Sequence, residues 1–140
     1  MDLAIVEHLI DTWPDAYPIL QKQKTLHPTK STAIKDEIDK ICHADFIYPI
    51  EYTSWVSNPI LVNKKQGTIC VCTDYQDLNT VFPKDNYPVP FIDQVIDECA
   101  GHEVLSFMDG FSGYNQIQIR YLDQYKTAFT TPWGIFAYCF

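Results

Sequence analysis

The amino-acid sequence predicts an α+β fold in a chain the size of one domain. Two segments with helical periodicity alternate with short β-prone runs, several of which are separated by turn residues. The 140 residues are 46% hydrophobic and 14% aromatic, which is enough to form a core. This composition indicates a globular protein and excludes a disordered or fibrous one.

Both helices are predicted from the spacing of apolar residues. Residues 31–43 place three isoleucines on one face, with Ser31 or Thr32 as the N-cap: Ile34, Ile38 and Ile41. Residues 91–100 form a second helix that ends at Gly101, and its apolar face consists of Ile92, Val95, Ile96 and Cys99.

The strands are predicted from β-prone runs on either side of turns. Residues 60–62 and 68–73 flank a Lys-Lys-Gln-Gly turn, and residues 126–131 and 135–140 flank a Pro-Trp-Gly turn, so each pair predicts a hairpin. Residues 104–108 predict a buried strand that ends at Asp109. Residues 74–79 form a polar stretch, and residues 1–27 an irregular lead-in segment interrupted by two prolines.

The charge has the wrong sign for an isolated nucleic-acid-binding domain. Ten Lys and Arg against 18 Asp and Glu give a net charge of −8, and Arg120 is the single arginine. Contacts to phosphate come from basic side chains. If the chain binds nucleic acid, other parts of a longer protein must supply many of the basic residues that contact phosphate.

The cysteines and the N-terminus favour a cytoplasmic or nuclear location. The five cysteines include no C-x-x-C pair, and an odd number without a secretory signal favours reduced thiols. Cys70 and Cys72 are expected on one side of a strand, but two ligands do not complete a zinc site. The sequence contains no signal peptide and no transmembrane segment, so no membrane partner is expected.

A series of short motifs runs along most of the chain: residues 37–40 (EIDK), 55–59 (WVSNP), 62–67 (VNKKQG), 72–79 (CTDYQDLN), 83–90 (PKDNYPVP), 106–117 (SFMDGFSGYNQI) and 126–129 (KTAF). In order and spacing, these motifs resemble the fingers and early palm of reverse transcriptases from gypsy-class LTR retrotransposons. The resemblance implies a partial right-hand polymerase at residues 28–140, with the fingers and the first part of the palm.

The resemblance also implies template-directed DNA synthesis and the residues that perform it. Two Mg²⁺ ions about 4 Å apart would clamp the attacking and leaving oxygens, and Asp109 with the carbonyl of Gly110 matches the family's first metal-binding motif. Tyr114 matches the aromatic residue that excludes a ribose 2′-hydroxyl. One of Lys64 and Lys65, with Lys65 favoured, is implied to contact the incoming phosphates, and Phe111 completes the implied nucleotide site. The implied partners are an RNA or DNA template–primer and deoxynucleotides.

Two departures from the family pattern predict that this chain is inactive alone. It contains no adjacent Asp-Asp pair, which is the family's second catalytic motif, and the thumb and RNase H regions are missing too. Cys70, Gln76 and Cys139 stand where the family usually has Arg, and a thiol cannot replace a guanidinium at a phosphate. A chain that stops within a predicted strand is also expected to be truncated.

Other interpretations of these residues stay open. An Asp at a strand end is more often a turn or cap residue, a Tyr near a turn is usually packed in a core, and two Lys at a hairpin tip are usually solvated. The alternative function is a non-catalytic remnant that binds nucleic acid or protein. A third interpretation is an unrelated α+β domain, against which the ordered motifs argue.

Overall fold

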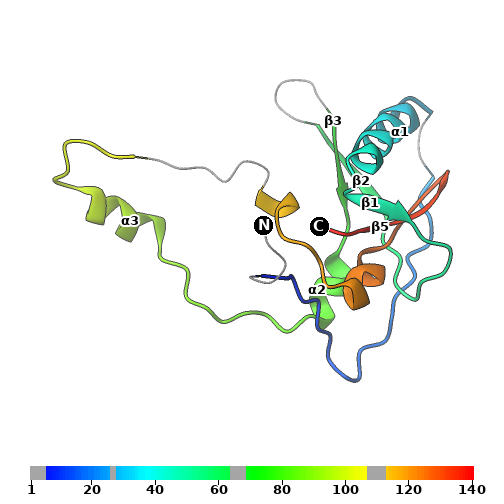
Figure 1. Cartoon of the computed structure of the whole chain (residues 1–140), viewed down its shortest axis with the longest axis horizontal. Coiled ribbons are helices and arrows are strands. Elements are labelled where there is room, and N and C mark those ends of the chain that lie inside the picture. Colours follow the sequence, from blue (N-terminus) through cyan, green and yellow to red (C-terminus); the bar gives the residue numbers. More distant parts are fainter. Residues whose placement is uncertain (1–5, 26–27, 64–68, 107–112) are drawn as a thin grey trace.

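The computed structural model describes residues 6–25, 28–63, 69–106 and 113–140. Helices and strands are mixed along the chain, which confirms the α+β prediction. Figure 1 shows a body that contains both sheets and a long segment that leaves this body and returns to it. The elements in chain order are α1 (Pro28–His43), β1 (Ile47–Pro49), β2 (Pro59–Asn63), β3 (Ile69–Thr73), α2 (Gln76–Val81), α3 (Ile92–Cys99), η1 (Gly113–Asn115), η2 (Tyr121–Thr127), β4 (Phe129–Thr131) and β5 (Gly134–Tyr138).

Helix α1 is stabilised because isoleucines on one of its faces pack against the first sheet. Ile34 and Ile38 are buried, and they pack with Ile47 of β1 and Phe129 of β4. The helix begins at Pro28, where a proline fits because the first helical N–H has no partner within the helix. Ser31 and Thr32 therefore lie inside α1, and the prediction that one of them caps it is wrong.

The strands form two small antiparallel sheets. In the first, β5 lies between β1 and β4, with Ile47 opposite Tyr138 and Phe129 opposite Phe136. In the second, β2 and β3 form the predicted hairpin, whose turn lies outside the described residues. Bonds between Ser57 and the backbone on either side of Phe129 connect the two sheets.

A second core lies on the other side of Tyr138. It consists of Ile10, Trp55, Leu78 and Ile119, so four distant parts of the sequence meet there. Tyr138 packs against both cores and joins them. The lead-in segment thus contributes to the folded body: the amide of His8 donates to the carbonyl of Gln118 at 2.8 Å, and the carbonyl of His8 accepts from Arg120 at 2.9 Å.

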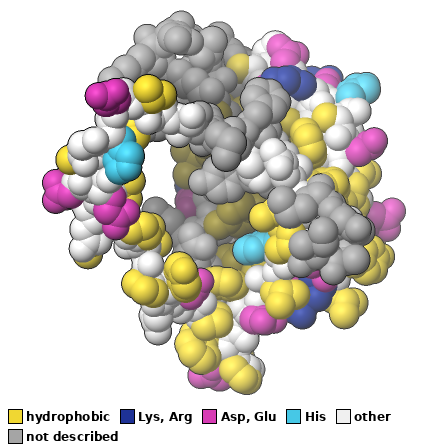
Figure 2. Space-filling view, turned by 60° about the vertical axis from the view of Figure 1, so that its left-hand side comes forward, with side chains coloured by type: hydrophobic (Ala, Val, Ile, Leu, Met, Phe, Trp, Pro, Cys, Tyr) yellow, Lys and Arg dark blue, Asp and Glu magenta, His cyan; other side chains and the backbone are white. Residues whose placement is uncertain are grey.

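Residues 83–106 form the segment that stands away from the body, called the arm below (Figures 1 and 2). Helix α3 confirms the second predicted helix, and Gly101 after it adopts a φ of +92°, which favours glycine. None of the eight residues of α3 is buried. Large apolar side chains exposed along the arm include Tyr87, Val89, Phe91, Ile92, Ile96 and Val104.

Three short elements differ from the sequence prediction. The polar stretch after β3 contains α2, whose Leu78 is buried in the second core. Residues 121–127 form the 3-10 helix η2, so β4 begins at Phe129 and not at residue 126. Residues 104–106 have no regular structure, and the rest of the strand predicted there lies outside the described residues. No helix in the described part of the chain is long and apolar enough to cross a membrane.

Candidate functional site

An open cleft of about 820 Å³ lies next to the second core. Its walls come from four parts of the chain: the lead-in, α2 and its flanks, the segment that begins at η1, and the residues around β5. Most of the lining is apolar, namely Ile10, Leu78, Phe82, Ile117, Ile119, Tyr138 and Phe140, and polar groups at its edge include His8, Asn79 and Asn115. A cleft of this size and character is typical of a site that takes a ligand or another part of a protein.

The last residues of the predicted catalytic motif line this cleft. Asp109, Gly110 and Phe111 lie outside the described residues, as do Lys64 and Lys65. Tyr114 lies in η1, where its backbone is described, and its neighbours Gly113 and Asn115 line the cleft. The structure therefore brings the end of the motif, Gly113 and Asn115, to the cleft.

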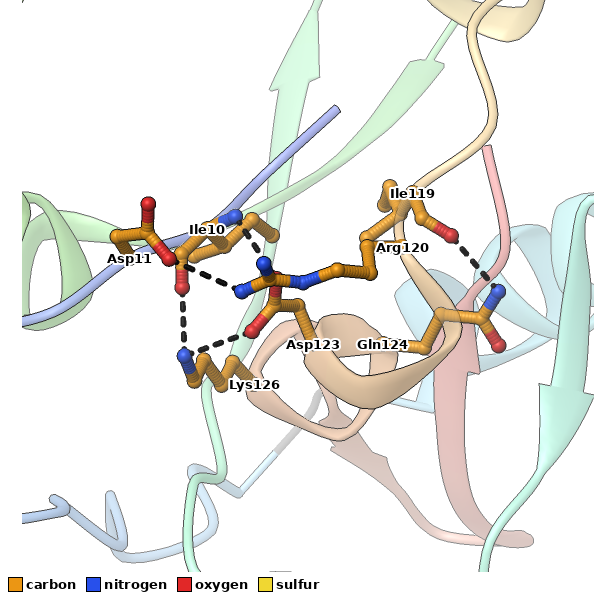
Figure 3. A network of polar contacts seen from close by, with 7 residues as sticks. All are labelled: Ile10, Asp11, Ile119, Arg120, Asp123, Gln124 and Lys126. Carbon is orange, nitrogen blue, oxygen red and sulfur yellow. Dashed lines mark hydrogen bonds and ion pairs between the residues drawn. The ribbon is translucent and has the colours of Figure 1, made fainter. Parts of the chain in front are cut away.

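A charged network that sequence reasoning missed holds the wall formed by residues 117–120. Asp123 is only 2% exposed, and its carboxylate accepts hydrogen bonds from Arg120 Nε at 2.6 Å and Lys126 Nζ at 2.8 Å (Figure 3). The amide of Ile10 donates to the same carboxylate at 3.2 Å, and Lys126 also donates to the carbonyl of Ile10. Arg120 reaches Asp11 at 2.9 Å. The network thus fastens the lead-in segment to η2.

The surroundings of Asp123 keep it ionised. Burial alone would raise the pKa of Asp123, but hydrogen bonds from Arg120, Lys126 and Ile10 outweigh burial and lower it. Next to it, the amide of Gln124 donates to the carbonyl of Ile119 at 3.0 Å. Arg120, Asp123 and Lys126 are spaced three residues apart, and this spacing is the feature of the sequence that could have predicted the cluster.

Tyr75 closes another side of the cleft. Its hydroxyl donates to the carbonyl of Thr127 at 2.7 Å. Burial raises the pKa of Tyr75 far above its ordinary value, so the phenol stays neutral and acts as a hydrogen-bond donor. The role of Tyr75 in the cleft wall is to tie α2 and its flank to η2.

Asn58 holds the hairpin to the lead-in segment. Its side chain is fully buried. The side-chain oxygen accepts a hydrogen bond from the backbone amide of Lys24 at 3.1 Å, and the side-chain nitrogen donates to the carbonyl of Lys22 at 3.0 Å. Gln21 accepts from the backbone of Asn58 at 2.9 Å and donates to Asp77 at 2.8 Å. Residues 55–59 therefore connect the lead-in, the hairpin and α2.

Comparison with known proteins identifies relatives among retroelements. The chain is 30% identical over 134 residues to the Transposon Tf2-3 and Tf2-4 polyproteins of Schizosaccharomyces pombe, and this match covers 95% of the chain. The native prototype foamy virus protease-reverse transcriptase superposes with a TM-score of 0.76 at 20% identity over 95% of the chain. The chain is thus similar in sequence to part of a retrotransposon polyprotein and similar in fold to part of a protease-reverse transcriptase. No protein-family model matches the chain.

The chain corresponds to a small part of each relative. It spans 10% of the length of the Tf2-3 polyprotein and 18% of the native foamy virus chain. The foamy viral enzyme has also been solved with an RNA/DNA hybrid, and that structure superposes with a TM-score of 0.74 at 15% identity over 96% of the chain. The α+β fold is thus the fold of part of a retroviral protease-reverse transcriptase.

Proposed function

We propose that this chain is the fingers and early palm of a gypsy-class RNA-directed DNA polymerase and carries its first catalytic carboxylate, Asp109. The ordered motifs of the sequence, together with 30% identity to a retrotransposon polyprotein across 95% of the chain, are the observation that carries the proposal. The position of η1 supports it, because the end of the motif lies on the wall of a cleft.

In this proposal each residue acts through its own chemistry. The carboxylate of Asp109 and the carbonyl of Gly110 present hard oxygen ligands, which are the donors that Mg²⁺ prefers. Bound Mg²⁺ would stabilise the charge that develops on the transferring phosphate. Lys65, with Lys64 as the alternative, would pair with the phosphates of the nucleotide, and backbone amides around Phe111 would face them. Tyr114 would fill the space that a ribose 2′-hydroxyl needs.

One carboxylate cannot hold two ions in a fixed geometry, so the proposal includes inactivity of this chain by itself. The sequence has no Asp-Asp pair. Among the described residues, no three His, Cys, Asp or Glu side chains are grouped to hold a metal ion. The additional carboxylates would have to be supplied by another part of a complete polymerase.

A motif transplant tests the proposed role of Asp109. Residues 104–117 of this chain would replace the aligned segment of the prototype foamy virus protease-reverse transcriptase. We expect the chimera to extend a primer with deoxynucleotides and Mg²⁺, and Asp109→Asn to reduce the rate more than about a hundredfold, because even outer partners of metal ligands contribute up to that factor.

The matched control in the same segment is Ser106→Ala, which should retain the rate of the chimera. Equal primer extension by the chimera and by its Asp109→Asn variant would overturn the assignment. Chain 1–140 alone should give no extension product under the same conditions.

The exposed apolar side chains of the arm favour a second candidate function, a non-catalytic module that binds another protein. Some foamy viral structures contain dsDNA or an RNA/DNA hybrid, so nucleic acid is the competing partner. A gel shift of an RNA–DNA hybrid at several salt concentrations separates these possibilities. Binding that weakens steeply with salt indicates phosphate contacts, whereas no shift favours the protein-binding module.

A further inference from the structure

Two cysteines lie side by side on the outer face of the hairpin. Cys70 and Cys72 occupy alternate positions of β3, opposite Val62 and Ile60 of β2. Val71 between them points the other way and packs against the first core. The two Sγ atoms are 3.9 Å apart, Cys72 is exposed and Cys70 is half-buried, and neither residue forms a disulfide. The pair is therefore accessible from solvent.

A disulfide between these two residues would lie at the limit of the usual disulfide geometry. A disulfide needs an S–S distance of about 2.05 Å and usually a Cα–Cα distance of about 4.4–6.8 Å. Alternate residues of an antiparallel strand lie about 6.8 Å apart, at the upper limit of that range.

The observed Sγ–Sγ separation is suited to a shared metal ion. An ion bound at about 2.3 Å from each sulfur would subtend an S–metal–S angle of about 116° across the observed 3.9 Å, between tetrahedral and trigonal values. We propose that Cys70 and Cys72 chelate one thiophilic d¹⁰ cation of the Zn²⁺ class through both sulfur atoms.

The proposed site is open, unlike a structural zinc site with four protein ligands. No group of three or more His, Cys, Asp and Glu side chains occurs in the described residues, so water or a small thiol completes the coordination. Thiolates select soft and borderline cations over Mg²⁺ and Ca²⁺. On binding, each S–H bond breaks, its proton goes to solvent, and two metal–sulfur bonds replace metal–water bonds, without oxidation or reduction.

This site is independent of the proposed polymerase function, because Mg²⁺ prefers oxygen ligands and Asp109 lies in another motif. Cys70 is one of the positions at which this chain departs from the resembled family pattern, and it places a second thiol next to Cys72.

Titration of reduced chain 1–140 with Cd²⁺ tests the proposal. Cd²⁺ reports thiolate binding through an ultraviolet charge-transfer band, and native mass spectrometry gives the number of ions bound. We expect one ion per chain, and at least about tenfold weaker binding in Cys70→Ser and Cys72→Ser, because loss of a direct ligand should cost no less than loss of an outer partner. Binding should strengthen as pH rises, since protons are released.

Cys99→Ser is the matched control, because Cys99 lies on α3 in the arm and should not affect binding. Bound Cd²⁺ should also slow alkylation of Cys70 and Cys72 in the unsubstituted chain but not of Cys99, a readout that does not depend on how well a variant folds. Equal affinity in the Cys72→Ser variant, or equal loss in the Cys99→Ser variant, would overturn the proposal.

Discussion

Asp123 shows how one side chain can connect segments more than a hundred residues apart. Its carboxylate is nearly fully buried and is hydrogen-bonded by two basic side chains and the amide of Ile10. A buried carboxylate in such a network stabilises the fold only while all partners are present, because each loses its hydration on burial. Asp123 is thus one of the groups that hold the lead-in segment, and with it one wall of the cleft, in place.

We expect Asp123→Asn to lower the free energy of unfolding by about 3 kcal/mol, since it leaves Lys126 in a buried position without its charged partner. The pKa of Asp123 is lowered in the folded state. Its stabilisation is therefore complete above the unfolded-state pKa of about 3.9 and is lost as pH falls through the folded-state pKa. Urea denaturation as a function of pH should show that the free energies of unfolding of the unsubstituted chain and of Asp123→Asn converge below about pH 4. Asp11→Asn, at the exposed end of the network, should change stability much less, and an equally large effect would contradict this account.

At the scale of secondary-structure elements, α1 and α3 have similar apolar stripes but opposite surroundings. Ile38 of α1 is 3% exposed, whereas Ile96 of α3 is 60% exposed. A helix as short as α3 is marginal in water without a surface to pack on. The amphipathic face of α3 therefore marks a surface that is complementary to something other than the described body.

Substitution of one isoleucine in each helix tests this difference. Ile38→Ala should lower the free energy of unfolding by about 2–5 kcal/mol, because it removes buried methyl groups and leaves a cavity in the first core. Ile96→Ala should change the free energy of unfolding by no more than about 0.5 kcal/mol, because the Ile96 side chain is already exposed to water. Urea midpoints of the two variants, measured against the unsubstituted chain, provide the comparison. A loss for Ile96→Ala as large as that for Ile38→Ala would show that α3 packs against the body.

The elements that the sequence predicted well are those specified by local patterns. Helix α1 follows from isoleucine spacing, and the β2–β3 hairpin follows from two β-prone runs around a Gly-containing turn. The prediction missed β1 and α2, because three or six residues carry too little periodicity and their positions are set by distant partners such as β5 and Ile119. The site follows the same rule: the motif around Asp109 is recognisable in sequence, whereas the role of Asp123 exists only once residues 10 and 123 meet.

At the scale of the whole molecule, the arm separates two parts of the chain that form one body. The part before the arm contributes β1, and the part after it contributes β5, which pairs with β1. The same two parts meet where Ser57 donates to the carbonyl of Ala128 at 2.9 Å and where Tyr75 donates to Thr127. Both cores also contain residues from each part.

A single cut in the arm should therefore leave the body assembled. We would insert the recognition sequence of a site-specific protease between Asp85 and Asn86, which are exposed. After cleavage, the two fragments should elute together from a gel-filtration column under native conditions and separate in concentrated urea, because the contacts between them include a β-ladder and both apolar cores. The Asp123→Asn variant carrying the same site should release its fragments at lower urea, since the bond from Ile10 to residue 123 crosses between the fragments. Separation of the unsubstituted fragments without urea would mean that the chain before the arm and the chain after it fold as independent units, and the cleft between them would not be a property of the folded body.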